Sequence, residues 1–243
     1  PLLEELGIRV LSTLSGDGRI AQIRTAHRAK LNVLVCAKSL VSLTRKMEER
    51  YGIPSISLSF YGQRDTSNGL LAIAEALGDP GLIKRTKQLI AREETKLSEK
   101  LKPYQTFFKG KKAVLNTGGN KTWSIAAALQ DLGLEVVATA VKKATEDDRE
   151  KARQTLGNKG VLMMNPGVEQ AKIIDETGAD LLLAGGRSLY TAIKKGIAFA
   201  DVNQEKKKSY GGYDGLLNLA EDLKNALQNP VFKNVARRAP WEK

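Results

Sequence analysis

Short apolar runs and amphipathic stretches alternate along almost the whole chain. Buried strands are predicted where aliphatic residues run between polar turns, as at 31–35 (LNVLV), 112–116 (KAVLN) and 180–184 (DLLLA). Residues 56–60 alternate apolar positions with serine, the pattern of a strand with one buried face. Helical spacing separates these runs, for example over 39–51 and 122–132. The alternation predicts an α/β fold of two Rossmann-like units with doubly wound, mostly parallel sheets.

A long charged segment divides the chain. Residues 81–101 have the apolar spacing of one helix, and Lys102-Pro103 is predicted to end it because proline cannot donate to the helix ladder. We therefore expect a first α/β unit at 1–78, a helical connector at 79–104, and a second α/β unit with a C-terminal helix at 105–243. The first unit is expected to be incomplete at its N-terminus. The chain opens in what reads as the end of a helix, followed by a strand at 8–12, so it is interpreted as a fragment of a longer protein.

Composition narrows the class of protein. Hydrophobic residues make up 42% and charged residues 27% of the 243 residues, which is typical of a globular chain. No apolar run reaches the roughly 18 residues of a membrane helix, and a single cysteine indicates a reducing, cytoplasmic setting. The net charge of +12 favours an anionic partner. Nucleic acid is not expected as that partner, because no aromatic–basic platform accompanies the charge.

Cys36 lies where open α/β sheets bind ligands. It directly follows the predicted strand at 31–35 and precedes a helix, with Lys38 close by. A helix start and a nearby ammonium both favour the thiolate, which suits a metal ligand or a nucleophile. A lone cysteine is more often a small buried hydrophobe, and its position alone does not decide between these interpretations.

Two glycine-rich turns follow other predicted strands. Gly118-Gly119-Asn120-Lys121 places backbone amides and an ammonium at a helix start, and Gly185-Gly186-Arg187 repeats the arrangement. Neither turn has the spacing of a Walker A or dinucleotide motif. Each is compatible with an anion cradle or with a tight turn that brings helix and strand together. The polar segment 201–205 follows the last predicted strand and has the character of a site loop.

Several short runs, taken in order, resemble the nitrogenase component 1 family. They are residues 26–32 (AHRAKLN), Cys36, 47–54 (MEERYGIP), 60–62 (FYG), 117–119 (TGG), 131–133 (DLG), 210–215 (YGGYDG) and 239–241 (APW). The resemblance covers essentially the whole chain, and the combined pattern is specific where each piece is not. It implies Rossmann-like units and a metal cofactor, and it favours Cys36 as a metal ligand.

Two departures indicate which branch of the family the chain resembles. The catalytic α subunit holds its iron–molybdenum cofactor through a cysteine and a histidine, and Asn203 stands at the histidine position. Lys121 stands where the catalytic subunit has arginine. Both departures resemble the carboxyl-terminal half of the cofactor-assembly scaffold subunit. The amino-acid sequences at 184–192 and 203–205 resemble it as well. The resemblance implies a scaffold that holds an iron–sulfur precursor during maturation with molybdenum and homocitrate, before transfer to apo-nitrogenase.

The resemblance also implies a ligand set and partners. Cys36 is the expected metal ligand, and the expected cofactor-binding residues are Gly118, Gly119, Asn120, Lys121, Gly185, Gly186, Arg187 and Asn203. A homologous partner subunit in a heterotetramer, a reductase component and apo-nitrogenase as acceptor are the expected partners, without a membrane. The family's amino-terminal domain supplies cysteines for a second cluster, so no second-cluster ligands are expected in this chain. The absence of that amino-terminal domain would also leave the cofactor pocket open on one side.

Two other functions fit parts of the pattern. The first is a catalytic nitrogenase α subunit or a related reductase, which would reduce substrate with a β partner. The second is an anion- or nucleotide-binding α/β module without metal, which would use the two Gly-Gly turns and tolerate loss of Cys36.

Overall fold

The computed structural model describes residues 1–14, 18–35, 39–117, 120–141, 156–157, 160–203, 205 and 208–235. The chain forms two compact units. Unit 1 comprises Pro1–Phe60 and Asp65–Thr95, and unit 2 comprises Tyr61–Arg64 and Lys96–Lys243. The division expected from the sequence, at 1–78, 79–104 and 105–243, stays a prediction.

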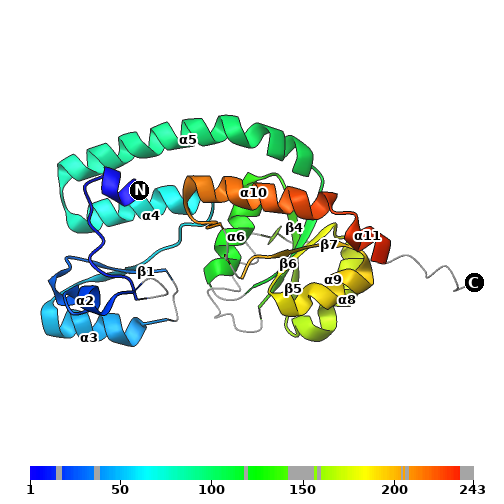
Figure 1. The fold of residues 1–243 in the computed structure, drawn as a ribbon, viewed down its shortest axis with the longest axis horizontal. Coiled ribbons are helices and arrows are strands. Elements are labelled where there is room, and N and C mark those ends of the chain that lie inside the picture. Colours follow the sequence, from blue (N-terminus) through cyan, green and yellow to red (C-terminus); the bar gives the residue numbers. More distant parts are fainter. Residues whose placement is uncertain are drawn as a thin grey trace, which may run out of the picture. The chain divides into compact units, whose positions relative to one another are not determined.

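Unit 2 is built on a five-stranded parallel sheet in the order β5-β4-β3-β6-β7 (Figure 1). Its strands are β3 (Lys112–Asn116), β4 (Glu135–Ala140), β5 (Val161–Met163), β6 (Leu181–Ala184) and β7 (Ala198–Asp201). The chain moves outward from β3 through β4 to β5, then returns to the other side of β3 and continues to β7. This order is that of a doubly wound sheet, with its topological switch point between β3 and β6. The predicted fold class is confirmed.

Helices cover both faces of this sheet. Figure 1 shows α6 (Asn120–Asp131) and α10 (Gly212–Gln228) toward one face, and α8 (Pro166–Thr177) and α9 (Leu189–Lys195) toward the other. Because both faces are covered, the central strands are apolar without alternation, and all four residues of β6 are buried. The short 3-10 helix η3 (Gly186–Ser188) precedes α9, and α11 (Val231–Val235) ends the described part of the chain.

Unit 1 contains a two-stranded parallel sheet of β1 (Asn32–Leu34) and β2 (Ser55–Ser57). The other elements beginning in residues 1–95 are α1 (Leu2–Glu5), α2 (Ile20–Ile23), η1 (Ala26–Arg28), α3 (Val41–Tyr51), α4 (Gly62–Leu77) and α5 (Pro80–Phe108). Ser67 Oγ on α4 donates to Glu94 Oε1 on α5 at 2.6 Å, which ties the two long helices together.

Two sequence-based expectations about these elements were wrong. Residues 8–12 form no strand, and Val10 is 54% exposed, because an apolar run becomes a strand only where a neighbour pairs with it. Helix α5 does not end at Lys102-Pro103 but continues to Phe108. Leu101 and Phe108 are fully buried on either side of Pro103, and burying this last turn offsets the hydrogen bond that proline cannot make.

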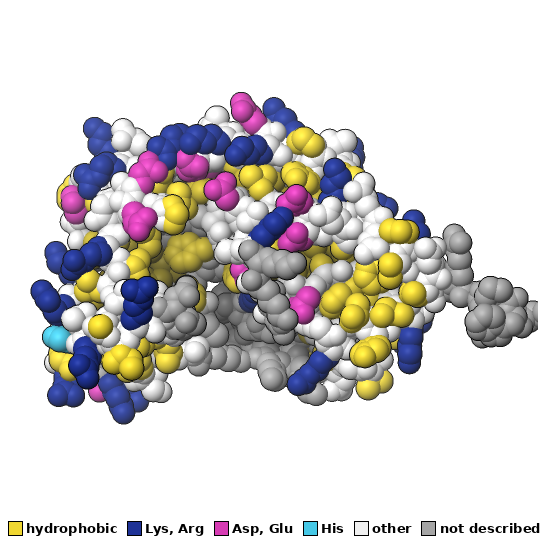
Figure 2. Space-filling view, viewed as in Figure 1, with side chains coloured by type: hydrophobic (Ala, Val, Ile, Leu, Met, Phe, Trp, Pro, Cys, Tyr) yellow, Lys and Arg dark blue, Asp and Glu magenta, His cyan; other side chains and the backbone are white. Residues whose placement is uncertain are grey.

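The surface shows how the positive charge is distributed. On the face drawn in Figure 2, lysine and arginine side chains are spread over several elements, including the long helix α5, rather than gathered in one patch. Large apolar side chains are also exposed in unit 2, on or beside α8, α9 and α11: Met164, Val168, Tyr190, Val231 and Val235. Among the residues that the structure describes, no helix is both long and apolar enough to cross a membrane.

Candidate functional site

The carboxyl ends of β3 and β6 meet at the switch point of unit 2. Asn116 at the end of β3 pairs in register with Ala184 at the end of β6. Two of the sequence-predicted residues in the turn that follows β3, Gly118 and Gly119, lie outside the described residues, as does the Asn120 side chain. Lys121, in the first turn of α6, is described. Both Gly-Gly turns therefore leave strands that border the switch point, where ligands of doubly wound folds bind.

The turn after β6 faces the segment after β7. Asp201 ends β7 beside Ala184, and the Asn203 backbone N–H donates to Asp201 Oδ1 at 3.0 Å. A Cβ placed on Gly185 would come within 2.8 Å of Asn203 Nδ2, and one placed on Gly186 within 3.4 Å of Asp201 Oδ2. Bare backbone at Gly185 is thus what leaves room for the Asn203 amide. Three of the predicted cofactor-binding residues, Gly185, Gly186 and Asn203, are brought together.

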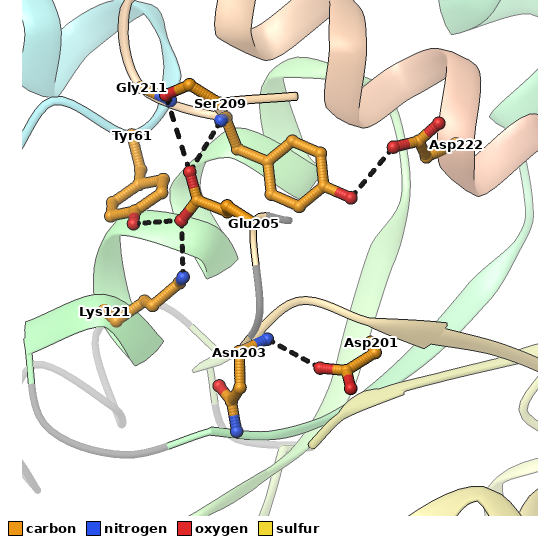
Figure 3. A network of polar contacts seen from close by, with 9 residues as sticks. Tyr61, Lys121, Asp201, Asn203, Glu205, Ser209, Gly211 and Asp222 are labelled. Atoms are coloured by element: carbon orange, nitrogen blue, oxygen red, sulfur yellow. Dashed lines mark hydrogen bonds and ion pairs between the residues drawn. The ribbon is translucent and has the colours of Figure 1, made fainter. Parts of the chain in front are cut away.

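The carboxylate of Glu205 binds and positions Lys121, one of the predicted cofactor-binding residues. Lys121 Nζ forms an ion pair with Glu205 Oε1 at 2.7 Å, and the Tyr61 hydroxyl donates to the same oxygen at 2.5 Å (Figure 3). The ammonium also lies 4.8 Å from the centroid of the Tyr61 ring, within cation–π range. The side chains of Lys121 and Glu205 are only 22% and 20% exposed, so this pair is largely withdrawn from water.

The second oxygen of Glu205 holds the segment that leads into α10. Glu205 Oε2 accepts from the Tyr210 backbone N–H at 2.8 Å, and the Tyr210 hydroxyl donates to Asp222 Oδ2 on α10 at 2.9 Å. Gly211 forms an antiparallel bridge with Tyr61, so the segment that leads into α10 lies beside the chain at Tyr61. Figure 3 shows this network converging on one carboxylate. Glu205 therefore joins α6, the chain at Tyr61 and the start of α10.

The ionisation states in this network follow from its contacts. Burial raises the pKa of the Glu205 carboxyl, while hydrogen bonds from the lysine, the Tyr210 N–H and the Tyr61 hydroxyl, together with the lysine charge, lower it. The lowering contributions dominate, so the pKa of Glu205 lies below its ordinary value. Burial, and next the contact with Glu205, raise the pKa of Tyr61 above its ordinary value. At neutral pH Glu205 is therefore an anionic carboxylate, and Tyr61 is a neutral phenol that donates to it.

Two predicted residues are not part of this arrangement. Arg187 lies exposed on η3, and within the described ranges no hydrogen bond or ion pair joins it to Lys121 or Asn203. Cys36 falls outside the described residues, which resume at Ser39. In the part of the chain that the structure describes, no group of three or more histidine, cysteine, aspartate or glutamate side chains gathers that could hold a metal ion.

Sequence reasoning missed a partly buried polar cluster beside the same strand ends. Asn116 Nδ2 donates to Gln170 Oε1 at 2.7 Å, and the Ser188 hydroxyl donates to the same oxygen at 3.3 Å. Gln170 on α8 is 3% exposed, and its Nε2 has no hydrogen-bond partner among the described residues. The only available signal was an asparagine ending an apolar strand. The roles of Glu205 and Tyr61 were also missed, because they depend on contacts between distant segments.

The doubly wound sheet, with polar turns gathered at its strand ends, is the framework of an α/β ligand-binding protein. The chain belongs to the nitrogenase component 1 type oxidoreductase family, whose family model matches residues 1–228.

The similar curated proteins refine this assignment. The chain is 49% identical over 243 residues to the nitrogenase iron-molybdenum cofactor biosynthesis protein NifE of Nostoc sp., covering 100% of the chain and 51% of that protein. It is 46% identical over 242 residues to NifE of Klebsiella pneumoniae, covering 99% of the chain and 53% of the relative. The chain thus spans about half the length of the curated relatives it matches.

Solved structures agree on the fold. The structure titled "Nitrogenase Cp1 at pH 6.5" matches with a TM-score of 0.82 at 22% identity, over 99% of this chain and 57% of that chain. "Nitrogenase Cp1 at pH 5" matches with a TM-score of 0.83 at 23% identity, over 99% and 55%. At these identities the likeness establishes the shared fold.

Proposed function

We propose that this chain is part of a scaffold for assembly of the nitrogenase iron–molybdenum cofactor. In this role it holds an iron–sulfur precursor as cargo during maturation and gives it up to apo-nitrogenase. The names of the NifE relatives support the role. The structural observation that carries it is the Asn203 amide, which lies against the bare backbone of Gly185 at the strand ends. An amide can donate to a sulfide or a carboxylate, but it is a weak ligand for iron compared with imidazole.

The residues at the strand ends fit an anionic cargo. The ammonium of Lys121 and the amide of Asn203 are hydrogen-bond donors, and Gly185, which has no side chain, leaves room for that amide. We assign supporting contacts to Gly118, Gly119, Asn120 and Arg187 on sequence grounds. Cys36 is assigned as the single thiolate anchor. One thiolate with hydrogen-bond donors holds a cluster less firmly than thiolate with imidazole, which suits cargo that must leave.

The same proposal includes the partners and reagents of assembly. A homologous partner subunit completes the scaffold as a heterotetramer, molybdenum and homocitrate enter the precursor there, and a reductase component assists. Apo-nitrogenase is the acceptor. We place the process in the cytoplasm, where a lone thiol stays reduced.

The test is to load the full-length protein and its partner subunit with iron and sulfide anaerobically, with and without Cys36→Ala. We expect the variant to lose the cargo cluster, measured as iron content and as an electron paramagnetic resonance signal resolved from that of any second cluster. Ser39→Ala, a small substitution at an exposed position three residues away, is the matched control and should load normally. Unchanged cargo-cluster content in Cys36→Ala would remove the proposal.

A further inference from the structure

Lys121 already has an anionic partner inside the protein. Its ammonium is 2.7 Å from Glu205 Oε1, and both side chains are about four-fifths buried. The same oxygen accepts from Tyr61, and the other oxygen accepts from the Tyr210 backbone N–H. Because donors from three separate segments fix both carboxylate oxygens, Glu205 has little freedom to swing away when an anion approaches Lys121.

We propose that Glu205 is a positioning residue that acts through Lys121. It fixes the ammonium beside the strand-end turns and shares its charge, so that anionic cargo is held loosely enough to be released. This inference rests on the proposed scaffold function.

The effect of Glu205 on an anion is electrostatic. An anion that binds at Lys121 must share the ammonium with Glu205, and it is repelled by the carboxylate at close range. This repulsion is only partly screened, because the pair is largely withdrawn from water. An unpaired ammonium at the same place would attract the anion without this opposition. Glu205 therefore weakens the hold on an anion while keeping Lys121 in place.

A purely structural role for Glu205 predicts the opposite result. If the carboxylate only braced the segment from Asn203 to Tyr210, its replacement would loosen the site, and cargo would leave sooner. If it competes for Lys121, its replacement makes cargo leave later. The direction of the change separates the two roles.

The test compares Glu205→Gln with wild type in the full-length complex. Glutamine keeps the size of the side chain and an oxygen that can accept from Lys121 and Tyr61, but it removes the charge. Release of loaded precursor to an iron chelator should slow by about tenfold, which corresponds to about 1.4 kcal/mol. The electron paramagnetic resonance spectrum of the cargo should also shift, because one fewer negative charge lies nearby. Glu176→Gln, which neutralises the exposed partner of Lys172 on α8, is the matched control and should change neither quantity.

A second measurement uses the unloaded complex and inorganic phosphate at low ionic strength. Glu205→Gln should bind phosphate about tenfold more tightly than wild type by titration calorimetry, and adding Lys121→Met should abolish the gain. Circular dichroism confirms folding of each variant. If Glu205→Gln does not fold, Glu205→Ala is used instead, since it also removes the negative charge beside Lys121 and should shift affinity in the same direction.

The outcomes are distinguishable. Release that is unchanged or faster in a folded Glu205 variant overturns the role of Glu205 while leaving the scaffold function standing. If wild type never loads a cluster, the scaffold function fails, and the phosphate titration alone decides the role of Glu205. In that titration, equal affinity or no measurable binding by the Glu205 variant overturns the inference.

Discussion

Gly215, in the first turn of α10, approaches the site network more closely than any side chain could tolerate. A Cβ added there would lie 2.3 Å from the Tyr210 carbonyl carbon, 2.6 Å from its oxygen and 3.0 Å from its Cα. Ordinary contacts begin at 3.4 Å, so the backbone would have to move by about 1 Å. These are backbone atoms, which cannot rotate out of the way as a flexible side chain can. Gly215→Ala must therefore displace Tyr210, whose N–H holds Glu205.

We expect Gly215→Ala to destabilise unit 2 by about 3 kcal/mol, at the upper end of the usual cost of overpacking. For a chain of this size, that corresponds to a fall in melting temperature of roughly 6–12 °C. Tryptophan fluorescence during urea unfolding is the appropriate assay, because Trp123 lies on α6 of unit 2.

Gly167→Ala is the matched control for this substitution. Gly167 lies in the first turn of α8, and a Cβ there would meet nothing within 4 Å. Alanine should be neutral or slightly stabilising, by up to about 1 kcal/mol, because glycine is a poor helix former. If Gly215→Ala left the unfolding midpoint within the range of Gly167→Ala, the close approach to Tyr210 would be refuted.

Three further predictions concern unit 2. Leu182→Ala, at a fully buried position of β6, should cost about 2–5 kcal/mol of unfolding free energy in the same assay, and a smaller loss would contradict tight packing there. Tyr61→Phe removes one donor to Glu205 and should cost about 1 kcal/mol, with a raised Glu205 pKa detectable by nuclear magnetic resonance. Because folding lowers the pKa of Glu205, its contribution to stability is complete above its unfolded value of 4.5 and is lost as pH falls through the lower folded value. The difference in unfolding free energy between wild type and Glu205→Gln should therefore shrink on the acid side. A difference that does not change with pH would argue against this contribution.

The sheet of unit 2 could be predicted from the sequence because its central strands are buried on both faces. The runs ending at Asn116 and Ala184 are continuous and aliphatic, and the structure places both in parallel strands. The run at 8–12 has a similar composition but forms no strand, since pairing depends on a neighbour that local sequence does not specify. The helix end predicted at Pro103 was also wrong, again because of contacts that local sequence does not specify. A local rule predicted a helix end, and the burial of Leu101 and Phe108 overrode it.

Only part of the candidate site could be predicted from the sequence. The rule that ligands meet the carboxyl ends of strands directed attention to Gly185 and Lys121, and both lie in turns or helix starts that follow central strands. The function of Glu205 could not be predicted in this way. Its contact with Tyr61 joins positions 144 residues apart, so the polar character of 201–205 could not indicate which side chains this glutamate contacts.

The pairing of Lys121 with Glu205 is better explained by ligand binding than by stability. Withdrawing both charges from water costs much of what their attraction returns, so a largely buried pair contributes little net stability. Glu205→Gln keeps a neutral acceptor for Lys121, but it loses the contact with the Tyr210 N–H and leaves a largely buried ammonium without its counter-charge, so it should lower the unfolding free energy by about 1–3 kcal/mol. An anion at Lys121, by contrast, experiences the whole carboxylate charge. Substitution at Glu205 should therefore lower the unfolding free energy and yet slow cargo release, a combination that a residue serving only the fold would not produce.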